Sequence, residues 1–187
     1  MDDSEKKKSL RDNLLEKRDN TSHDMLNIAS DKIRKKLNKI FAFKNAQKIG
    51  AYYPIGSEIF TQDIIQELIS NGKQVFLPKV IGKNIEFKKI TDFSNLETGS
   101  FDIMEPNETC PTDNDLDVLL VPTVGISQTG VRLGYGYGFY DRFLAEHKIV
   151  AISLILEKQI LKNIPKSEHD ILMDWIVTED KMSKIQK

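Results

Sequence analysis

Residues 130–142 carry the residue types best suited to chemistry in this chain: an arginine, three glycines at alternate positions, interleaved tyrosines and an aspartate. Five of the ten glycines lie between Gly125 and Gly138. Glycine lets backbone N–H groups approach an anion closely, and the N-terminus of a following helix adds partial positive charge. This segment, called the glycine loop below, therefore predicts a phosphate cradle, and hence a nucleotide or another phosphorylated ligand.

The glycine loop matches neither of the common phosphate-binding motifs. Val131-Arg132 follows Gly130 where a P-loop requires Lys and then Ser or Thr, and the spacing from Gly134 differs from the dinucleotide fingerprint. One alternative is a glycine-rich turn that only packs a strand against a helix. Arg132 and Asp141 favour a ligand site, because guanidinium grips phosphate and Mg²⁺ prefers carboxylate together with phosphate oxygens. The helix dipole alone would also account for Asp141 in a first turn.

Length and composition indicate the broad class of the protein. The 187 residues are 40% hydrophobic and 29% charged, which predicts one soluble globular domain over residues 1–187. No apolar run approaches the roughly 20 residues that span a bilayer, and the first residues lack a secretory signal, so we expect a cytoplasmic location. The net charge of −1 argues against nucleic-acid binding. Cys110 is the only cysteine, which excludes an internal disulfide.

Charge is unevenly distributed along the chain. Residues 1–48 hold 13 Lys and Arg against 8 Asp and Glu, whereas residues 101–120 hold six acids and no base. We expect a solvated basic helical face and a solvated acidic loop. Segment 102–117 could be a mobile lid or only a solvated connection, and the sequence does not decide between them.

Hydrophobic periodicity indicates alternating helices and strands. A helix over 22–41 is favoured by apolar residues at steps of three and four, and a helix over 4–19 carries three leucines on one side. The strand predicted at 117–121 is apolar from Val118 to Val121, which is typical of burial on both faces. Such alternation predicts an α/β fold with a mainly parallel sheet, in which ligands bind beyond the carboxyl ends of strands. The apolar residues of the first two helices are Leu10, Leu14, Leu15, Met25, Ala29, Ile33, Leu37 and Ile40; further helices are predicted at 61–70 and 139–147, and further strands at 49–53, 74–77 (ended by Pro78), 85–90, 149–156 and 175–178.

Several motifs in order resemble one family. Arg132-Leu-Gly-Tyr-Gly-Tyr-Gly-Phe-Tyr-Asp-Arg142 resembles the signature of the 5-formyltetrahydrofolate cyclo-ligases, also called methenyltetrahydrofolate synthetases. Lys7-Lys-Ser-Leu-Arg11 is similar to the N-terminal motif of that family, and Tyr52-Tyr-Pro-x-x-x-Glu58 to its substrate segment. His169-Asp170 and the residues up to Glu179 resemble its C-terminal motif. The resemblance extends over nearly the whole chain.

This resemblance implies a fold, a reaction and a set of ligands. The fold would be a single three-layer domain like that of sugar isomerases and CoA transferases, with N-terminal helices 4–41 packed on the α/β core. The reaction would be ATP- and Mg²⁺-dependent cyclisation of 5-formyltetrahydrofolate, with or without a polyglutamate tail, to 5,10-methenyltetrahydrofolate. ADP and phosphate would be released after phosphorylation of the formyl oxygen. We expect a monomer with no nucleic-acid or membrane partner.

The resemblance also implies residue roles. Arg132 and Tyr140 would be catalytic, and Asp141 and Asp170 would hold Mg²⁺. Without the resemblance, Lys7 and Arg11 could be a solvated helical stripe, Tyr53 strand core, Glu58 a helix-entry carboxylate and Asp170 a turn former. The substrate would contact Tyr53, Glu58, Tyr135 and Tyr137, and ATP would contact Lys7, Arg11, Arg132, Leu133, Gly134, Tyr135, Gly136, Tyr137, Gly138, Phe139 and Tyr140.

Two residues of the glycine loop depart from the pattern of the family. Tyr137 stands where relatives often carry glycine or lysine, and Phe139 where tyrosine is common. A non-catalytic folate- or nucleotide-binding protein on the same fold is therefore an alternative function. A sugar-phosphate isomerase or acyl-CoA enzyme is a second alternative, but it leaves the Lys7 and Arg11 pair and Glu58 unexplained.

Overall fold

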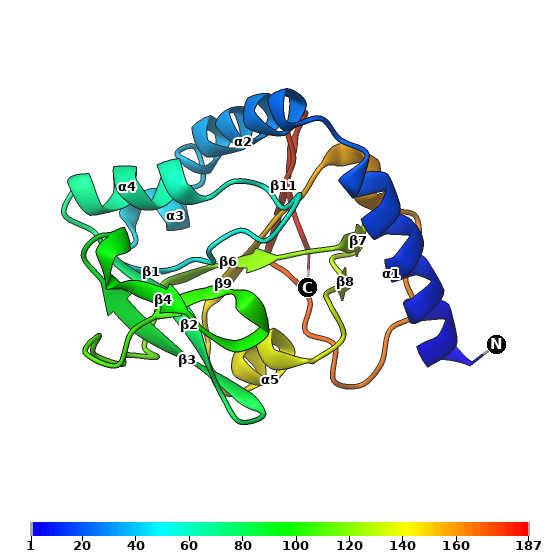
Figure 1. Ribbon diagram of the computed structural model, residues 1–187. Coiled ribbons are helices and arrows are strands. Elements are labelled where there is room, and N and C mark those ends of the chain that lie inside the picture. Colours follow the sequence, from blue (N-terminus) through cyan, green and yellow to red (C-terminus); the bar gives the residue numbers. More distant parts are fainter. Residues whose placement is uncertain (1, 187) are drawn as a thin grey trace.

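The computed structural model describes residues 2–186, and a seven-stranded sheet lies at its centre (Figure 1). The strand order is β12-β11-β9-β6-β1-β2-β3. The five inner strands run parallel, and only β3 and β12 at the two edges pair antiparallel. The mainly parallel sheet predicted from the sequence is confirmed. Its strands are β1 (Lys48–Gly50), β2 (Gln74–Ile81), β3 (Asn84–Ile90), β6 (Val118–Pro122), β9 (Val150–Leu154), β11 (Trp175–Val177) and β12 (Met182–Lys184).

The sheet is covered by helices on both faces, which explains why β6 is apolar throughout. Val118 and Leu120 belong to one buried cluster, with residues of α2 (His23–Leu37), α3 (Phe41–Asn45) and α4 (Gln62–Ser70). Leu119 and Val121 belong to a second cluster, with Phe143 of α5 (Phe139–Glu146). Successive side chains of a strand point to opposite faces, so a strand between two helical layers must be apolar at every position.

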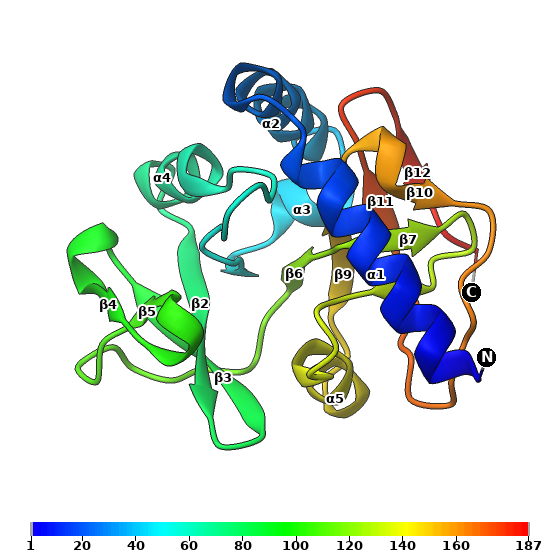
Figure 2. The ribbon, with the colours of Figure 1, turned by 45° about the vertical axis from the view of Figure 1, so that its right-hand side comes forward.

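The N-terminal helix α1 (Asp3–Asp19) lies apart from these two layers and beside a small second sheet (Figure 2). That sheet has the order β10-β7-β8 and consists of β7 (Gly125–Ser127), β8 (Arg132–Leu133) and β10 (Ile160–Leu161). Leu14 of α1 is buried against Val124, Val131 and Leu133 in a third apolar cluster. Packing on β7 and β8 therefore holds α1 next to the glycine loop. A short 3₁₀ helix, η3 (Glu157–Gln159), precedes β10.

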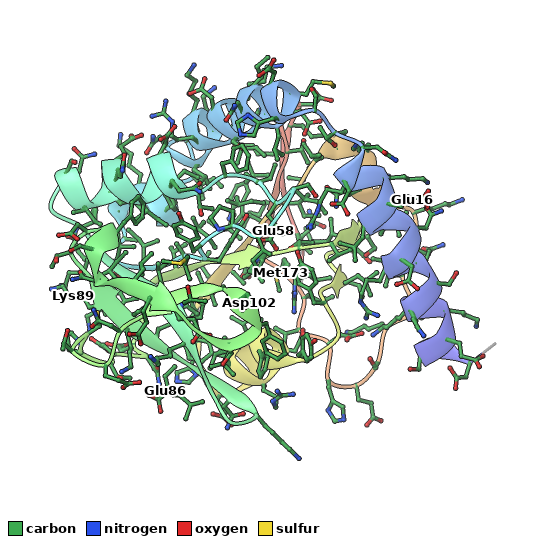
Figure 3. All side chains as sticks on the ribbon, viewed as in Figure 1. Glu16, Glu58, Glu86, Lys89, Asp102 and Met173 are labelled. Carbon is green, nitrogen blue, oxygen red and sulfur yellow. The ribbon has the colours of Figure 1, made fainter. Side chains whose placement is uncertain are left out.

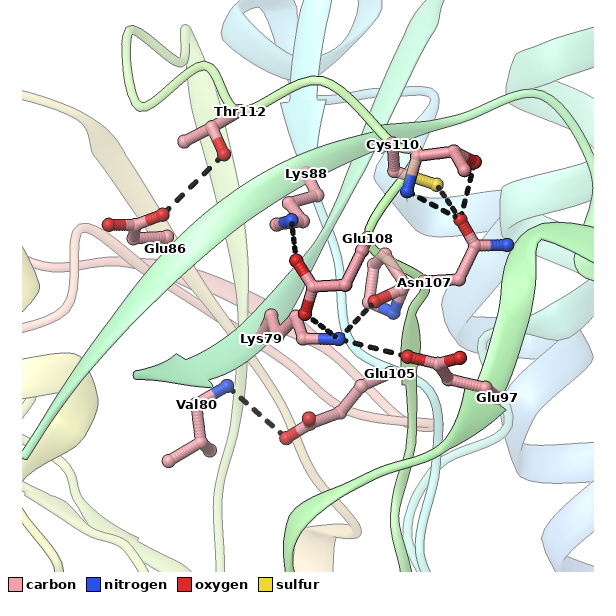
Figure 4. Close-up of polar contacts among 12 residues, drawn as sticks. Lys79, Val80, Glu86, Lys88, Glu97, Glu105, Asn107, Glu108, Cys110 and Thr112 are labelled. Carbon is pink, nitrogen blue, oxygen red and sulfur yellow. Dashed lines mark hydrogen bonds and ion pairs between the residues drawn. The ribbon is translucent and has the colours of Figure 1, made fainter. Parts of the chain in front are cut away.

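A hairpin of β4 (Leu96–Thr98) and β5 (Met104–Pro106) lies beside β2, with 3₁₀ turns η1 (Phe93–Asn95) and η2 (Ser100–Asp102). Lysines from the main sheet anchor this hairpin (Figure 4). Lys79 Nζ lies 3.0 Å from Glu97 Oε1 and 2.9 Å from Glu108 Oε1, and Lys88 Nζ lies 3.1 Å from Glu108 Oε2. The buried carboxylate of Glu105 accepts a hydrogen bond from Val80 N at 3.2 Å. Four of the six acids in residues 101–120 are exposed, as expected for most of them, whereas Glu105 is buried.

Pro78 does not end its strand as predicted, because β2 continues through it to Ile81. Pairing with β1 stops at Phe76, whose carbonyl accepts from Ala51 N. The backbone groups of alternate residues in a strand point to the same side of that strand. The backbone nitrogens of Pro78 and Val80 therefore point to the side of β2 on which Phe76 pairs with β1. Beyond Phe76 no strand of the described residues pairs with this side of β2, and Val80 N donates to the Glu105 side chain instead. Proline is tolerated because its missing N–H costs no ladder bond.

Two predictions about the second helix were wrong. The helix over 22–41 is two helices, because α2 ends at Leu37 and α3 begins at Phe41. Met25 is 64% exposed, and Leu26 takes the buried position instead. Ala29, Ile33 and Leu37 are buried as predicted. No helix in the part of the chain that the structure describes is long and apolar enough to cross a membrane.

Candidate active site

A cavity of about 760 Å³ opens beside the carboxyl ends of β1 and β6. Tyr52 and Tyr53 follow β1, Pro122 ends β6, and all three line the cavity. This is the edge at which parallel sheets bind ligands. Every site residue predicted from the sequence lines the same cavity: Lys7, Arg11, Tyr53, Glu58, Arg132, Leu133, Gly134, Tyr135, Gly136, Tyr137, Gly138, Phe139, Tyr140, Asp141 and Asp170. The structure therefore brings these residues together, and their individual roles stay predictions.

The glycine loop needs its glycines for conformation and for close approach of arginines. Gly136 has φ +104° and Gly138 has φ +69°, values that side chains other than hydrogen disfavour. A Cβ on Gly134 would lie 2.4 Å from Arg132 Nη1, and the carbonyl of Gly134 accepts a 2.8 Å hydrogen bond from Arg11 Nε. The loop backbone is thus wrapped around two guanidinium groups.

Arg132 is almost fully buried where β6 meets α5. Its Nη1 donates to Pro122 O at 3.1 Å, and its Nη2 lies 2.7 Å from Asp141 Oδ2. The guanidinium carbon lies 5.7 Å from the ring centroid of Tyr140, within the range of a cation–π contact. Arg132 Nε is buried and has no hydrogen-bond partner among the described residues. A guanidinium that lines the cavity is suited to binding an anion.

A second cationic wall comes from α1. Lys7 Nζ lies 2.5 Å from Asp170 Oδ2 and donates to Ser167 Oγ at 2.8 Å. Burial raises the pKa of Asp170, but the hydrogen bonds from Lys7 and Ser167 outweigh it and hold that pKa below its usual value. Asp170 is therefore a carboxylate at neutral pH. Helix α1 thereby contacts the C-terminal segment as well as the glycine loop.

Two carboxylates lie on the same wall of the cavity and could hold a metal ion. Asp141 Oδ1 accepts a 3.3 Å hydrogen bond from Ile171 N, next to Asp170 in the chain. Among the described residues no group of three or more His, Cys, Asp or Glu could form a metal site. Mg²⁺ is usually held by one or two carboxylates together with phosphate oxygens, so this donor set fits magnesium bound with a nucleotide.

The rest of the cavity is mainly apolar, and the buried glutamates Glu58 and Glu105 also line it. Figure 3 places Glu58 near the middle of the molecule, whereas Glu16 and Glu86 lie toward its outside. Glu58 is 3% exposed; its Oε2 accepts from Ile55 N at 2.8 Å and its Oε1 from the Tyr135 hydroxyl at 2.8 Å. Burial raises the pKa of Glu58, and it also raises the pKa values of Tyr135 and Tyr140.

Three aromatic rings stand at the mouth of the cavity, and the sequence did not indicate one of them. The Tyr137 ring centroid lies 4.8 Å from that of Phe101 and 5.6 Å from that of Phe139. Phe101 comes from the β4–β5 hairpin and has φ +59°, an uncommon value for a residue other than glycine. Tyr137 is 55% exposed, so its bulk lies at the entrance of the cavity rather than inside it.

Arg18 is the second residue that sequence reasoning missed. It is buried on α1, and its Nη2 donates to the Tyr135 hydroxyl at 2.9 Å. The spacing of Lys7, Arg11 and Arg18 along one helix could have indicated it, because the three lie on similar sides of the helix. Ser167, which contacts Lys7, carried no such signal.

The mainly parallel sheet and its cavity define an α/β protein with a ligand pocket that has cationic side chains at one end and is mainly apolar at the other. The family model described as the 5-formyltetrahydrofolate cyclo-ligase family matches residues 3–179. The chain therefore belongs to the 5-formyltetrahydrofolate cyclo-ligase family, as the sequence motifs predicted, and so to a family of enzymes.

The names of individual proteins that are similar to this chain are consistent with this family assignment. The 5-formyltetrahydrofolate cyclo-ligase of Saccharomyces cerevisiae is 29% identical over 185 residues, covering 84% of this chain and 88% of that protein. That of Escherichia coli K12 is 31% identical over 147 residues, with 73% and 80% covered. The NMR structure of the Aquifex aeolicus 5,10-methenyltetrahydrofolate synthetase aligns with a TM-score of 0.87 at 32% identity and covers 97% of this chain and 93% of that one.

Proposed function

We propose that this protein converts 5-formyltetrahydrofolate to 5,10-methenyltetrahydrofolate with MgATP, releasing ADP and phosphate. One observation carries the proposal: a single cavity contains the glycine loop with Lys7 and Arg11 at one end and buried Glu58 at the other. A cationic end suits the triphosphate, and an apolar end suits a flat pterin. Family membership supports the same reaction.

At the apolar end, Glu58 is the group that would recognise the pterin. A carboxylate can accept paired hydrogen bonds from the amino group and the adjacent ring N–H of a pterin. Tyr53 lies on the same wall, edge-on to Phe93 at 5.8 Å between ring centroids, and would contact the folate ring. Tyr135 lies between the two ends of the cavity, because it belongs to the glycine loop and bonds to Glu58.

At the cationic end, Arg132, Lys7 and Arg11 would stabilise the phosphates. A transferred phosphoryl group spreads negative charge over its oxygens in the transition state, and fixed donors stabilise that charge without reorganising. Arg132 is held in place on two sides, by Pro122 O and by Asp141. Asp141 and Asp170 would hold the Mg²⁺ that accompanies ATP and offsets phosphate charge. Tyr140 would orient the guanidinium through its ring.

The chemistry needs no nucleophile from the protein. A formamide is a poor electrophile and its oxygen a poor leaving group. Transfer of the γ-phosphoryl group to the formyl oxygen breaks the bond to ADP and forms an imidate-like phosphate. The neighbouring arylamine nitrogen then attacks the formyl carbon and loses its proton, which the departing phosphate can accept, and phosphate leaves with that oxygen as the five-membered ring closes. The part of the protein is positioning, charge stabilisation and exclusion of water.

An absorbance assay tests this function directly. Purified protein is mixed with 5-formyltetrahydrofolate and MgATP, and the near-ultraviolet band of the methenyl product is followed. We expect product only when both ATP and magnesium are present. Folate or ATP binding by calorimetry without product would instead favour the non-catalytic binder, with Tyr137 and Phe139 as the altered residues.

A further inference from the structure

Arg18 is a buried cation that the reaction described above does not use. It is 4% exposed, its Nε donates to Ser57 Oγ at 2.9 Å and its Nη2 donates to the Tyr135 hydroxyl at 2.9 Å. Its guanidinium carbon also lies 5.8 Å from the Tyr135 ring centroid. Burying a charge is costly unless partners offset the loss of water. Arg18 Nη1 has no hydrogen-bond partner among the described residues, so the cost of burying this guanidinium is only partly offset. Stabilisation of the fold therefore does not by itself explain why an arginine stands here.

The Tyr135 hydroxyl connects Arg18 to Glu58. It accepts from Arg18 Nη2 and donates to Glu58 Oε1 at 2.8 Å. Arginine has donors and no acceptor, so the single hydrogen of the hydroxyl cannot point toward it. That hydrogen must point toward Glu58. The direction of each bond in this three-residue chain is thus fixed by Arg18.

The fixed direction favours one form of Glu58. Both of its oxygens accept hydrogen bonds, Oε1 from Tyr135 and Oε2 from Ile55 N, which is the pattern of a carboxylate. A carboxylate oxygen has two lone pairs, so each oxygen keeps one for a ligand. The ligand chemistry that matches is a flat heterocycle with two adjacent N–H donors.

We propose that Arg18 is a positioning residue for the folate end of the site, which holds the Tyr135 hydroxyl as a donor and thereby keeps Glu58 ready to accept a paired N–H ligand. This inference rests on the proposed function for the identity of that ligand. It also links the two ends of the cavity, because Tyr135 belongs to the glycine loop, and Arg11 of the same helix as Arg18 bonds to Gly134.

The electrostatics around Glu58 agree with this geometry. Burial raises the pKa of Glu58, whereas the Ile55 N–H, the charge of Arg18 and the Tyr135 hydroxyl lower it. The other titratable groups that interact with Glu58 are Tyr52, after β1, and Tyr140, on α5. Both are neutral phenols at physiological pH, since burial raises their pKa values. Arg18 is therefore the cation that opposes the effect of burial on Glu58.

The first test measures Glu58 itself, without relying on activity. Protein labelled with ¹³C at glutamate carboxyl carbons is titrated by NMR, and the Glu58 signal is assigned with Glu58→Gln. In Arg18→Met we expect Glu58 to titrate at a higher pH than in the wild type, with Arg18→Lys in between. Arg34→Met is the matched control, because Arg34 pairs with Asp31 and Glu67 away from the cavity. A Glu58 titration unchanged in Arg18→Met overturns the inference.

The second test separates positioning from a structural role. Arg18→Met should raise KM for 5-formyltetrahydrofolate about tenfold or more, the loss expected for a hydrogen bond to a charged group, with KM for MgATP nearly unchanged. The acid limb of its kcat/KM profile should move to higher pH. Equal loss toward both substrates with an unmoved acid limb would indicate only a structural role and overturn the inference.

Two safeguards keep the outcomes distinct. If Arg18→Met does not fold, Tyr135→Phe removes the same link while α1 stays intact, and an unchanged Glu58 titration in that variant overturns the inference. If the wild type makes no methenyl product, the proposed function fails while the carboxyl titration still decides the role of Arg18. A product-forming wild type with an unchanged titration removes the inference alone.

Discussion

Arg132 and Asp141 form a nearly buried ion pair across the start of α5, with 2.7 Å between Nη2 and Oδ2. Arg132 would neutralise phosphate directly, and Asp141 would do so through the Mg²⁺ that it holds. The ion pair joins these two groups. It also fixes each partner before a ligand arrives, because Arg132 is bonded to Pro122 O and Asp141 to Ile171 N. Preorganisation of this kind lowers the reorganisation needed in the transition state.

Replacing Arg132 with alanine should abolish most of the turnover. We expect kcat to fall about a hundredfold or more, the usual loss when one fixed donor to transition-state charge is removed. Steady-state rates from the methenyl absorbance measure the effect, and circular dichroism should show a retained fold. Arg34→Ala is the control, since Arg34 pairs with Asp31 and Glu67 away from the cavity. A near-normal rate in Arg132→Ala would remove the role given to it.

Asp141→Asn should raise the magnesium concentration needed for half-maximal rate. Asparagine keeps the size of the side chain but loses the charge that a hard cation prefers. A magnesium titration at fixed ATP measures the shift. Asp63→Asn serves as the control, because Asp63 occupies the first turn of α4 away from the cavity and shares only the helix-dipole effect. If both variants titrate like the wild type, Asp141 is a helix-stabilising residue and no more.

The buried carboxylate of Glu58 should make stability depend on pH in an uncommon direction. The pKa of Glu58 is raised above its ordinary 4.5, so the folded state binds a proton more tightly than the unfolded state. The contribution of Glu58 to the free energy of unfolding is fully present below the pKa that this carboxyl has in the unfolded state. It is lost as pH rises through the pKa of Glu58 in the folded state. Relative to Glu58→Gln, the wild type should lose stability across that window. Urea unfolding of both proteins between pH 4 and 8 measures this, and a constant difference would contradict it.

Tyr137→Ala should let the mouth of the cavity open more often, and ATP should then be hydrolysed without formation of the methenyl product. Each aromatic pair contributes about 0.5–1.5 kcal/mol, so losing the contacts with both Phe101 and Phe139 should increase opening about 5- to 150-fold. Water would then reach the activated phosphoryl group more often. The ratio of phosphate released to methenyl product formed should rise. Phe41→Ala is the control, because Phe41 is exposed on α3. An unchanged ratio would mean that the rings do not exclude water.

The core of the fold was predictable because its residues repeat with clear periods. The unbroken apolar run at 118–121 predicted a strand covered on both faces, and β6 at Val118–Pro122 is one. The two- and three-residue strands β7, β8 and β10 could not be predicted, because such segments are too short to show a period. Pro78 misled the prediction because its effect depends on which edge of β2 it faces, and only tertiary structure decides that.

The site was predictable where its residues are contiguous or belong to recognisable motifs. Phe101 was missed because its contact with Tyr137 joins segments far apart in the sequence, and a lone phenylalanine in an acidic stretch carries no signal. Arg18 was missed for a different reason. A basic residue on a basic helix is usually solvated, and only its place on the same side as Lys7 and Arg11 separates it in the sequence from Lys8 and Lys17, which are both exposed.

The placement of α1 has a consequence for how this protein can lose its activity. Among the described residues, the two large apolar clusters around the sheet include none from α1, which packs instead in the small third cluster. Yet Lys7 and Arg11 line the cavity from this one helix, and Arg18 contacts Tyr135, which lines it as well. Damage near the N-terminus would therefore yield protein that is abundant, well folded and inert, so its amount would be a poor measure of its competence.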